Sequence, residues 1–250
     1  LKTYYNMPCY CPFYAKGELT GASLETDETA ESTIIAEPEF DENDVEEAVI
    51  VRSKEGELAV LNAQDARNML LYIADKVIAQ KPYLTEIDSV IGDGDHGIGM
   101  AGGMQKAKKK LMKMESEENA YAVFEAAGKA MLLSMGGASG VIFGSLYLAG
   151  AKDVDAKPAL TAEDIAKMER KSLLAIQERG KAEVGDKTMV DALAPAVEAL
   201  EANKDKGLLE MLKAAEEAAR QGVENTKNYQ AKFGRAKSLM ERAIGYQDAG

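Results

Sequence analysis

Aspartates, glycines and a histidine share one short segment, residues 91–97, whose sequence is IGDGDHG. Asp88 precedes Asp93 by five residues, and His96 is the only histidine among the 250 residues. Neighbouring carboxylates such as Asp93 and Asp95 repel each other unless a cation lies between them. Oxygen ligands on a glycine-rich turn suit a hard divalent ion such as Mg²⁺, which usually shares its coordination shell with phosphate oxygens. The segment therefore indicates a metal–phosphate site.

Other patterns fit the same segment less well. Residues 92–97 match the dinucleotide-binding fingerprint G-x-G-x-x-G, but the two aspartates would repel a pyrophosphate. The chain also lacks the alternation of strands and helices that such a domain needs. An EF-hand loop would require glycine and glutamate where this chain has Ile98 and Met104. A tight Asp/Gly turn whose carboxylates cap the next helix is the remaining structural alternative.

Three more glycine-containing connections carry residues that could contact phosphate. In residues 135–140 (MGGASG), Ser139 near a helix start could bind an anion, or the glycines could form a helix cap and a close crossing. Residues 180–188 (GKAEVGDKT) fail the phosphate-loop pattern G-x-x-x-x-G-K-[ST] because Asp186 precedes the lysine. They could still pack on a nucleotide, or form a turn capped by Asp186. Arg235 is either a bidentate phosphate contact or an ordinary surface residue.

Composition limits the class of protein. The net charge is −12 with no basic cluster, which argues against a nucleic-acid partner. Cys9 and Cys11 are too close in sequence to staple the fold, and we interpret them as thiols in a reducing compartment. No apolar run approaches the ~20 residues of a membrane span, and no signal peptide is visible. We expect a cytoplasmic protein without a membrane partner, and a fragment, because the chain begins with Leu1.

The chain divides into two regions. Residues 1–55 are acidic, with no Lys or Arg between Lys16 and Arg52, and we expect a partly disordered linker or the tail of an upstream domain. Residues 56–250 are rich in helix-forming residues and form the second domain. Asn62 is the predicted cap of its first helix, and Thr161 with Asp164 resembles a capping box. Apolar periodicity and glycine stops, with Pro82 marking the end of the first helix, predict seven antiparallel helices, in residues 62–80, 98–113, 118–135, 139–149, 161–180, 188–202 and 208–230.

Together these segments resemble one family, the nucleotide-binding (L-type) subunit or domain of dihydroxyacetone kinases. The residues that carry the resemblance are 83–97, 136–140, 180–189, 234–236 and 244–248. Several motifs in order at compatible spacing make it specific, and it covers residues 61–250. It implies an all-α fold, an antiparallel barrel of eight amphipathic helices with the nucleotide on the loops at one end. It also implies that a K-type partner subunit or domain holds dihydroxyacetone through a histidine, while the L-type part presents the phosphoryl group of the nucleotide.

The resemblance assigns roles to individual residues. It implies two Mg²⁺ ions held by Asp88, Asp93 and Asp95. It implies ADP or ATP contacts at His96, Gly97, Ile98, Gly99, Ala138, Ser139, Gly180, Met189, Arg235, Asp248, Ala249 and Gly250. No residue is assigned a catalytic role. His96 could act as a general base, but we expect a phosphate or structural contact, because phosphoryl transfer depends on positioning and charge neutralisation.

Several features depart from the family pattern or leave its function open. Gly99 stands where some members have Asn, and Ala249 stands where the family has Pro. The chain stops where the family continues into its eighth helix, so we expect a barrel with an exposed apolar seam. The phosphoryl donor is either ATP or a phosphocarrier protein that rephosphorylates bound ADP. The alternative functions are a nucleotide-binding regulatory module without kinase activity and a helical scaffold whose turns are only caps.

Overall fold

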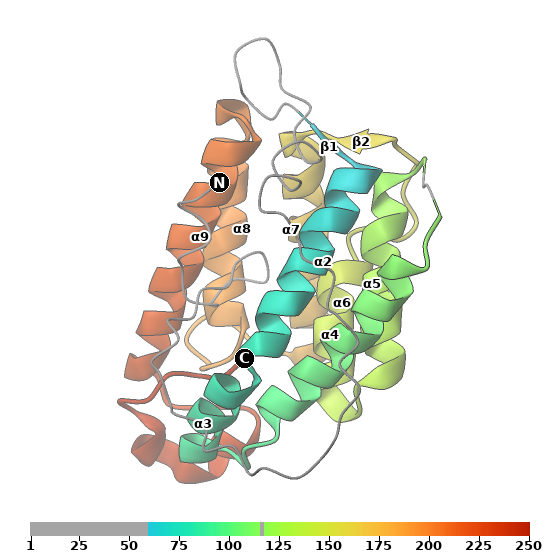
Figure 1. The fold of residues 1–250 in the computed structure, drawn as a ribbon. Coiled ribbons are helices and arrows are strands. Elements are labelled where there is room, and N and C mark those ends of the chain that lie inside the picture. Colours follow the sequence, from blue (N-terminus) through green and yellow to red (C-terminus); the bar gives the residue numbers. More distant parts are fainter. Residues whose placement is uncertain (1–59, 116–117) are drawn as a thin grey trace, which may run out of the picture.

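The computed structural model describes residues 60–115 and 118–250, which form an antiparallel helical barrel (Figure 1). The predicted linker and both cysteines lie outside the described residues. The α-helices are α2 (Ala63–Ala79), α3 (Lys81–Ile91), α4 (His96–Met112), α5 (Ala120–Ser134), α6 (Gly137–Leu148), α7 (Ala162–Gly180), α8 (Val190–Asn203) and α9 (Leu208–Asn225). The 3-10 helices are η2 (Lys204–Lys206), η3 (Thr226–Asn228) and η4 (Arg235–Ala243). The predicted all-α class is confirmed.

Two helices begin at the caps that the sequence predicted. The side chain of Asn62 accepts a hydrogen bond from the Asp65 backbone N–H at 2.8 Å at the start of α2. At the start of α7, Thr161 and Asp164 form the complete capping box, each side chain accepting from the other's backbone N–H. Such caps satisfy N–H groups that have no partner inside the helix.

A short antiparallel pair joins these two helix starts. Strands β1 (Leu61–Asn62) and β2 (Ala159–Leu160) pair with Leu61 opposite Leu160. Strand β1 is followed directly by α2, and one residue separates β2 from α7. Helices α2 and α7 therefore start at the same end of the barrel. The connections α3–α4, α5–α6 and α7–α8 and the end of α9 lie at the opposite end, at the bottom of Figure 1. We call this opposite end the loop end.

The prediction of seven helices was wrong, because it missed α3. Pro82 was interpreted as the end of the preceding helix, but it lies in the first turn of α3, where the missing proline N–H removes no helical hydrogen bond. Helix α3 buries only Leu84 and Ile91, but Leu84, Ile87 and Ile91 do have helical spacing, so the proline outweighed a helical signal that was present. Asp88 consequently lies in the last turn of a helix, and not on the following loop. Helices α4 and α6 also begin slightly earlier than predicted, at His96 and Gly137.

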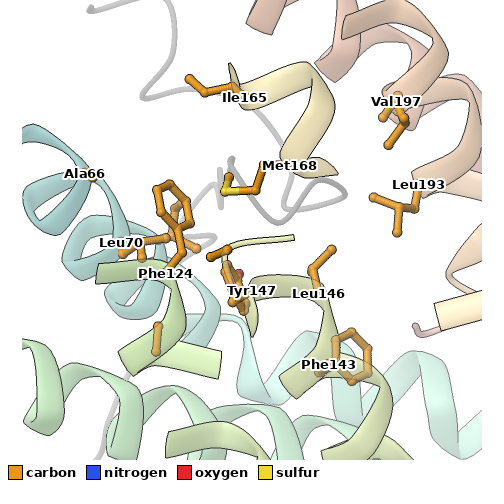
Figure 2. Close-up of a cluster of buried hydrophobic side chains, with 14 of the residues drawn as sticks. Ala66, Leu70, Phe124, Phe143, Leu146, Tyr147, Ile165, Met168, Leu193 and Val197 are labelled. Atoms are coloured by element: carbon orange, nitrogen blue, oxygen red, sulfur yellow. The ribbon is translucent and has the colours of Figure 1, made fainter. Parts of the chain in front are cut away.

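The helices pack in the succession α2, α4, α5, α6, α7, α8 and α9, each against the next. Helix α3 lies against the start of α4 and against η4. Their inner faces form one continuous hydrophobic core. In Figure 2, Phe124, Tyr147, Met168 and Leu193, from four successive helices of this order, reach into the common interior. None of the described helices combines the length and apolar character that crossing a membrane requires.

Candidate metal centre

Three carboxylates converge at the loop end. Asp88, Asp93 and Asp95 each place one oxygen within 4.8 Å of the other two. Asp88 is half-buried, whereas Asp93 and Asp95 are exposed to solvent. Three negatively charged oxygen donors at this separation fit a hard divalent cation with room left for water or phosphate ligands. The structure thus brings together the three residues that the sequence assigned to the metal.

Glycine makes this arrangement possible. A Cβ atom at Gly92 would clash with the carboxylate of Asp88, and Gly94 has a left-handed φ of +74°. A Cβ atom at Gly97 would clash with the backbone carbonyl of Lys81 at the start of α3. The loop after α3 can fold back on that helix only because these side chains are absent. The glycine spacing therefore reflects a close approach of backbone segments at the carboxylate cluster.

Helix capping accounts for only one of the three carboxylates. Asp88 Oδ2 accepts a hydrogen bond from the His96 backbone N–H at 3.1 Å, so this aspartate does cap α4. Asp95 occupies the N-cap position of α4, but its side chain makes no capping hydrogen bond. Asp93 Oδ2 instead forms an ion pair with Nε of Arg235 at 2.7 Å. The interpretation of residues 91–97 as a purely structural turn therefore explains Asp88 alone.

His96 is the first residue of α4, and its ring packs against α6. Its ring centroid is 5.6 Å from that of Phe143 in α6, with an interplanar angle of 52°. Burial lowers the pKa of the imidazole, and the negative charges of Asp88 and Asp95 act in the opposite direction. A ring packed against Phe143 supports the expected structural role more than a role as a general base.

The N-termini of α4 and α6 carry most of the predicted phosphate contacts. Gly97, Ile98 and Gly99 form the first turn of α4, and Ile98 is 57% exposed. A Cβ atom at Gly99 would meet nothing within 4 Å, so the structure leaves open space where some family members have Asn. Ala138 and Ser139 are exposed in the first turn of α6. Free N–H groups and the positive ends of two helix dipoles are suited to bind anions.

The remaining predicted positions lie at the end of α7, before α8 and after α9. Gly180 ends α7, and a Cβ atom there would lie 3.3 Å from Ile142 of α6. Met189 precedes α8, and its Cβ atom lies 3.8 Å from the position that a Cβ at Gly250 would occupy. Asp248 and Ala249 line the same cavity as Met189. Arg235, at the start of η4, reaches the cluster through its ion pair with Asp93.

The loop at residues 181–189 has a defined internal structure. Asp186 accepts a hydrogen bond from the Glu183 backbone N–H at 2.8 Å, as in the capped turn that the sequence offered as one alternative for this loop. Asp191, which the sequence analysis missed, accepts from the backbone N–H groups of Gly185 at 2.5 Å and Thr188 at 2.7 Å. An acidic residue in the first turn of α8 was a signal that could have identified this contact.

Residues 246–250, the chain-end segment, cross the loop end of the barrel. Gln247 donates from Nε2 to the hydroxyl of Tyr83 in α3 at 3.3 Å, and the Asp248 N–H donates to Oγ1 of Thr226 at 3.0 Å. Burial raises the pKa of Asp248 to about 7, although the N–H of Gly250 and the ammonium of Lys187 oppose this. The sequence analysis missed Tyr83, Lys187 and Thr226 as partners of this segment.

A cavity of about 90 Å³ extends from this segment into the barrel. Tyr83, His96 and Met189 line it near the loop end, and the interior wall is largely apolar. Glu169 of α7 also lines the cavity and is only 2% exposed. Its Oε2 atom has no hydrogen-bond partner among the described residues, and burial raises its pKa to about 8.

Comparison with known proteins identifies the family. Residues 90–250 match the model of the DAK2 domain. This chain belongs to the DAK2 domain family. Within it, the ADP-binding subunit DhaL of the PEP-dependent dihydroxyacetone kinase of Escherichia coli (strain K12) is 37% identical over 185 residues, which are 73% of this chain and 88% of that subunit. The corresponding subunit of a PTS-dependent dihydroxyacetone kinase of Lactococcus lactis is 38% identical over 179 residues, covering 70% of this chain and 84% of the subunit.

Longer proteins match this DAK2 chain over part of their length. L-erythrulose kinase of Pectobacterium atrosepticum is 32% identical over 254 residues, which include 100% of this chain and 40% of the kinase. The crystal structure of the dihydroxyacetone kinase from C. freundii in complex with AMP-PNP and Mg²⁺ superimposes with a TM-score of 0.57 at 22% identity, covering 88% of this chain and 35% of that kinase. That likeness shows the fold. The chain thus spans just over a third of the solved kinase.

Proposed function

We propose that this chain is the nucleotide- and Mg²⁺-binding component of a dihydroxyacetone-type kinase, a phosphotransferase. It presents a phosphoryl group to a small ketose held on a K-type partner subunit or domain. The observation that carries the proposal is the convergence of Asp88, Asp93 and Asp95 within 4.8 Å of one another at the N-terminus of α4. The names of the relatives support it, because they are kinases or ADP-binding subunits of kinases. They do not favour the alternative of a regulatory module.

The residues present fit Mg²⁺. The three aspartates offer only oxygen donors, and water can reach two of them, as expected for an ion that keeps part of its hydration shell. In this proposal Asp88, Asp93 and Asp95 hold two ions between them. Bound Mg²⁺ supplies positive charge to the phosphate oxygens of the nucleotide.

The chain's own groups position the phosphates. The N–H groups in the first turns of α4 and α6 bind phosphate oxygens, and Gly99 leaves the space beside them open. The Arg235 guanidinium adds a fixed positive charge near the cluster. Met189 and residues 248–250 contact the nucleoside from the other side. Phosphoryl transfer then depends on positioning and charge, and the attacking hydroxyl belongs to the ketose on the partner.

A titration and an assay test the proposal together. Isothermal titration calorimetry with ADP should show binding that requires Mg²⁺. Mixing the chain with a K-type subunit, dihydroxyacetone and a phosphoryl donor should give dihydroxyacetone phosphate, whereas either protein alone should not. Absence of binding at about 1 mM ADP with Mg²⁺, a range that includes weak sites, would contradict the proposal and favour the helical-scaffold alternative.

The phosphoryl donor is a finer part of the proposal. Matching relatives include subunits named PEP-dependent and PTS-dependent and single-chain kinases. The rate of ADP release separates the two mechanisms. An ATP-dependent enzyme releases ADP at least once per turnover, whereas an enzyme that is rephosphorylated by a phosphocarrier protein keeps ADP bound over many turnovers. The match to L-erythrulose kinase over 100% of this chain supports the proposal that residues 1–55 are a linker or the tail of an upstream domain.

A further inference from the structure

Lys187 has an unusual position for a lysine. Its side chain is only 2% exposed, and its backbone has a left-handed φ of 59°. Glycine or asparagine adopts this backbone conformation at lower energy, by about 1–2 kcal/mol in the case of glycine. A lysine that is both buried and in this conformation points to a function of its ammonium group.

The ammonium joins two segments that are distant in sequence. Lys187 Nζ donates to the backbone carbonyl of Thr226, which follows α9, at 2.7 Å. It also donates to the backbone carbonyl of Tyr246 in the chain-end segment. The first contact places a positive charge at the C-terminal end of α9, where the helix dipole favours a cation. The second fastens the segment that continues into Asp248.

The contacts around Lys187 hold this segment in one place. Thr226 Oγ1 accepts from the Asp248 N–H at 3.0 Å, and the Asp248 carboxylate accepts from the Gly250 N–H at 3.0 Å. Asp191 fixes the opposite side of the loop by binding the N–H groups of Gly185 and Thr188, so the loop can direct Lys187 inward. The ammonium is therefore the link between the loop before α8, the end of α9 and the chain-end segment.

We propose that Lys187 is a positioning residue of the nucleotide site. By binding the carbonyls of Thr226 and Tyr246, it holds residues 246–250 against Met189, so that the loop and the chain-end segment form one wall of the site. This inference rests on the proposed function for its ligand, but the tethering of the segment is a property of the protein without ligand.

The first measurement needs no nucleotide. Hydrogen–deuterium exchange, followed by mass spectrometry, should show faster exchange in the peptide that contains residues 246–250 when Lys187→Met removes the ammonium. Exchange in α5, far from the lysine in sequence, should not change. Lys206→Met is the matched control, because Lys206 is exposed at the other end of α8 and α9. Unchanged exchange in residues 246–250 would overturn the proposal, whatever the protein binds.

The second measurement is a double-mutant cycle on ADP affinity with Mg²⁺. Lys187→Met should weaken ADP binding by about tenfold, the loss expected for one charged hydrogen-bonding group, and a chain ending at Gly245 should weaken it by at least as much. The combination should be no weaker than the shortened chain alone, because the lysine acts through the missing segment. Additive losses would overturn the proposal. If the chain without substitutions does not bind ADP, the proposed function is contradicted, but the exchange measurement still tests whether Lys187 tethers residues 246–250.

Folding is checked separately. The far-ultraviolet circular dichroism of Lys187→Met should remain that of the normal chain. Lys187→Gln, which keeps a shorter neutral donor, should give an intermediate change in both exchange and affinity. If neither variant folds, the lysine supports the fold as a whole and the proposal is overturned.

Discussion

Carboxyl groups occupy two contrasting regions of this protein. At the loop end, Asp88, Asp93 and Asp95 lie close together and solvent reaches them. Inside the barrel, Glu169 lies alone against an apolar wall, and burial raises its pKa to about 8. The clustered groups can be compensated by a cation from solvent, whereas the buried group is compensated by a proton. The same chemical group thus serves different purposes because its solvent and neighbours differ.

Removing the charge of the loop-end cluster should give the largest effect. In the double variant Asp93→Asn and Asp95→Asn, the affinity for ADP with Mg²⁺ should fall on the order of 10³-fold, because two charged ligands are lost. Calorimetric titration measures this loss. The helical circular dichroism should remain mostly intact, because neither side chain caps α4. Asp155→Asn, in the exposed connection at the opposite end, is the control and should bind normally. Wholesale unfolding of the double variant would indicate a structural role.

Neutralising the interior carboxyl should change stability and its dependence on pH. The pKa of Glu169 is about 8 in the folded protein and 4.5 in the reference state. Between these values the unfolded chain binds fewer protons, so stability falls as pH rises, by about 1.4 kcal/mol per pH unit from this group. Glu169→Gln should remove that part of the slope between pH 5.5 and 7.5, as measured by urea unfolding. Glu178→Gln, exposed on the same helix, is the control and should keep the pH slope of the unsubstituted chain. An equal slope in both variants would contradict the raised pKa of Glu169.

The backbone beneath the loop-end cluster can be tested with two glycines of α4. Gly97→Ala should lower the free energy of unfolding by about 1–3 kcal/mol, because its Cβ would clash with the Lys81 carbonyl and push α4 away from α3. Gly102→Ala should raise it by about 0.5–1 kcal/mol, because a Cβ there meets nothing within 4 Å and alanine favours the helix. Urea unfolding measures both. Equal effects of the two substitutions would contradict the close approach of α3 and α4.

The ion pair at the edge of the cluster should give the smallest effect. Arg235 and Asp93 are both solvent-accessible, so Arg235→Gln should change the free energy of unfolding by less than about 1 kcal/mol. The same substitution should weaken ADP binding by about tenfold, since a charged contact to phosphate is lost. Arg242→Gln, exposed on the same 3-10 helix, is the control. A large loss of stability with unchanged ADP affinity would show that Arg235 serves the fold.

The prediction from sequence succeeded where the signal was local. The caps at Asn62 and Thr161 and the periodicity of the long helices are read within one or two turns, and both caps are present. Helix α3 was missed because Pro82 was interpreted as a stop, although Leu84, Ile87 and Ile91 have helical spacing. The distinction between proline as a stop and proline in a first turn depends on whether the following residues pack, which is a tertiary property.

The sequence by itself determined the helical class, because helix propensity is a local property. Ligand chemistry, which is also local, indicated a magnesium–phosphate site and named the three aspartates that the structure brings together. Only the tertiary structure decided that Asp88 reaches the site from the end of a helix. It also decided that Arg235 joins the site across more than a hundred residues of chain, and that Lys187 lies buried against carbonyls of two distant segments. Those facts depend on which helix ends the barrel brings together, and helix packing over the whole core determines that.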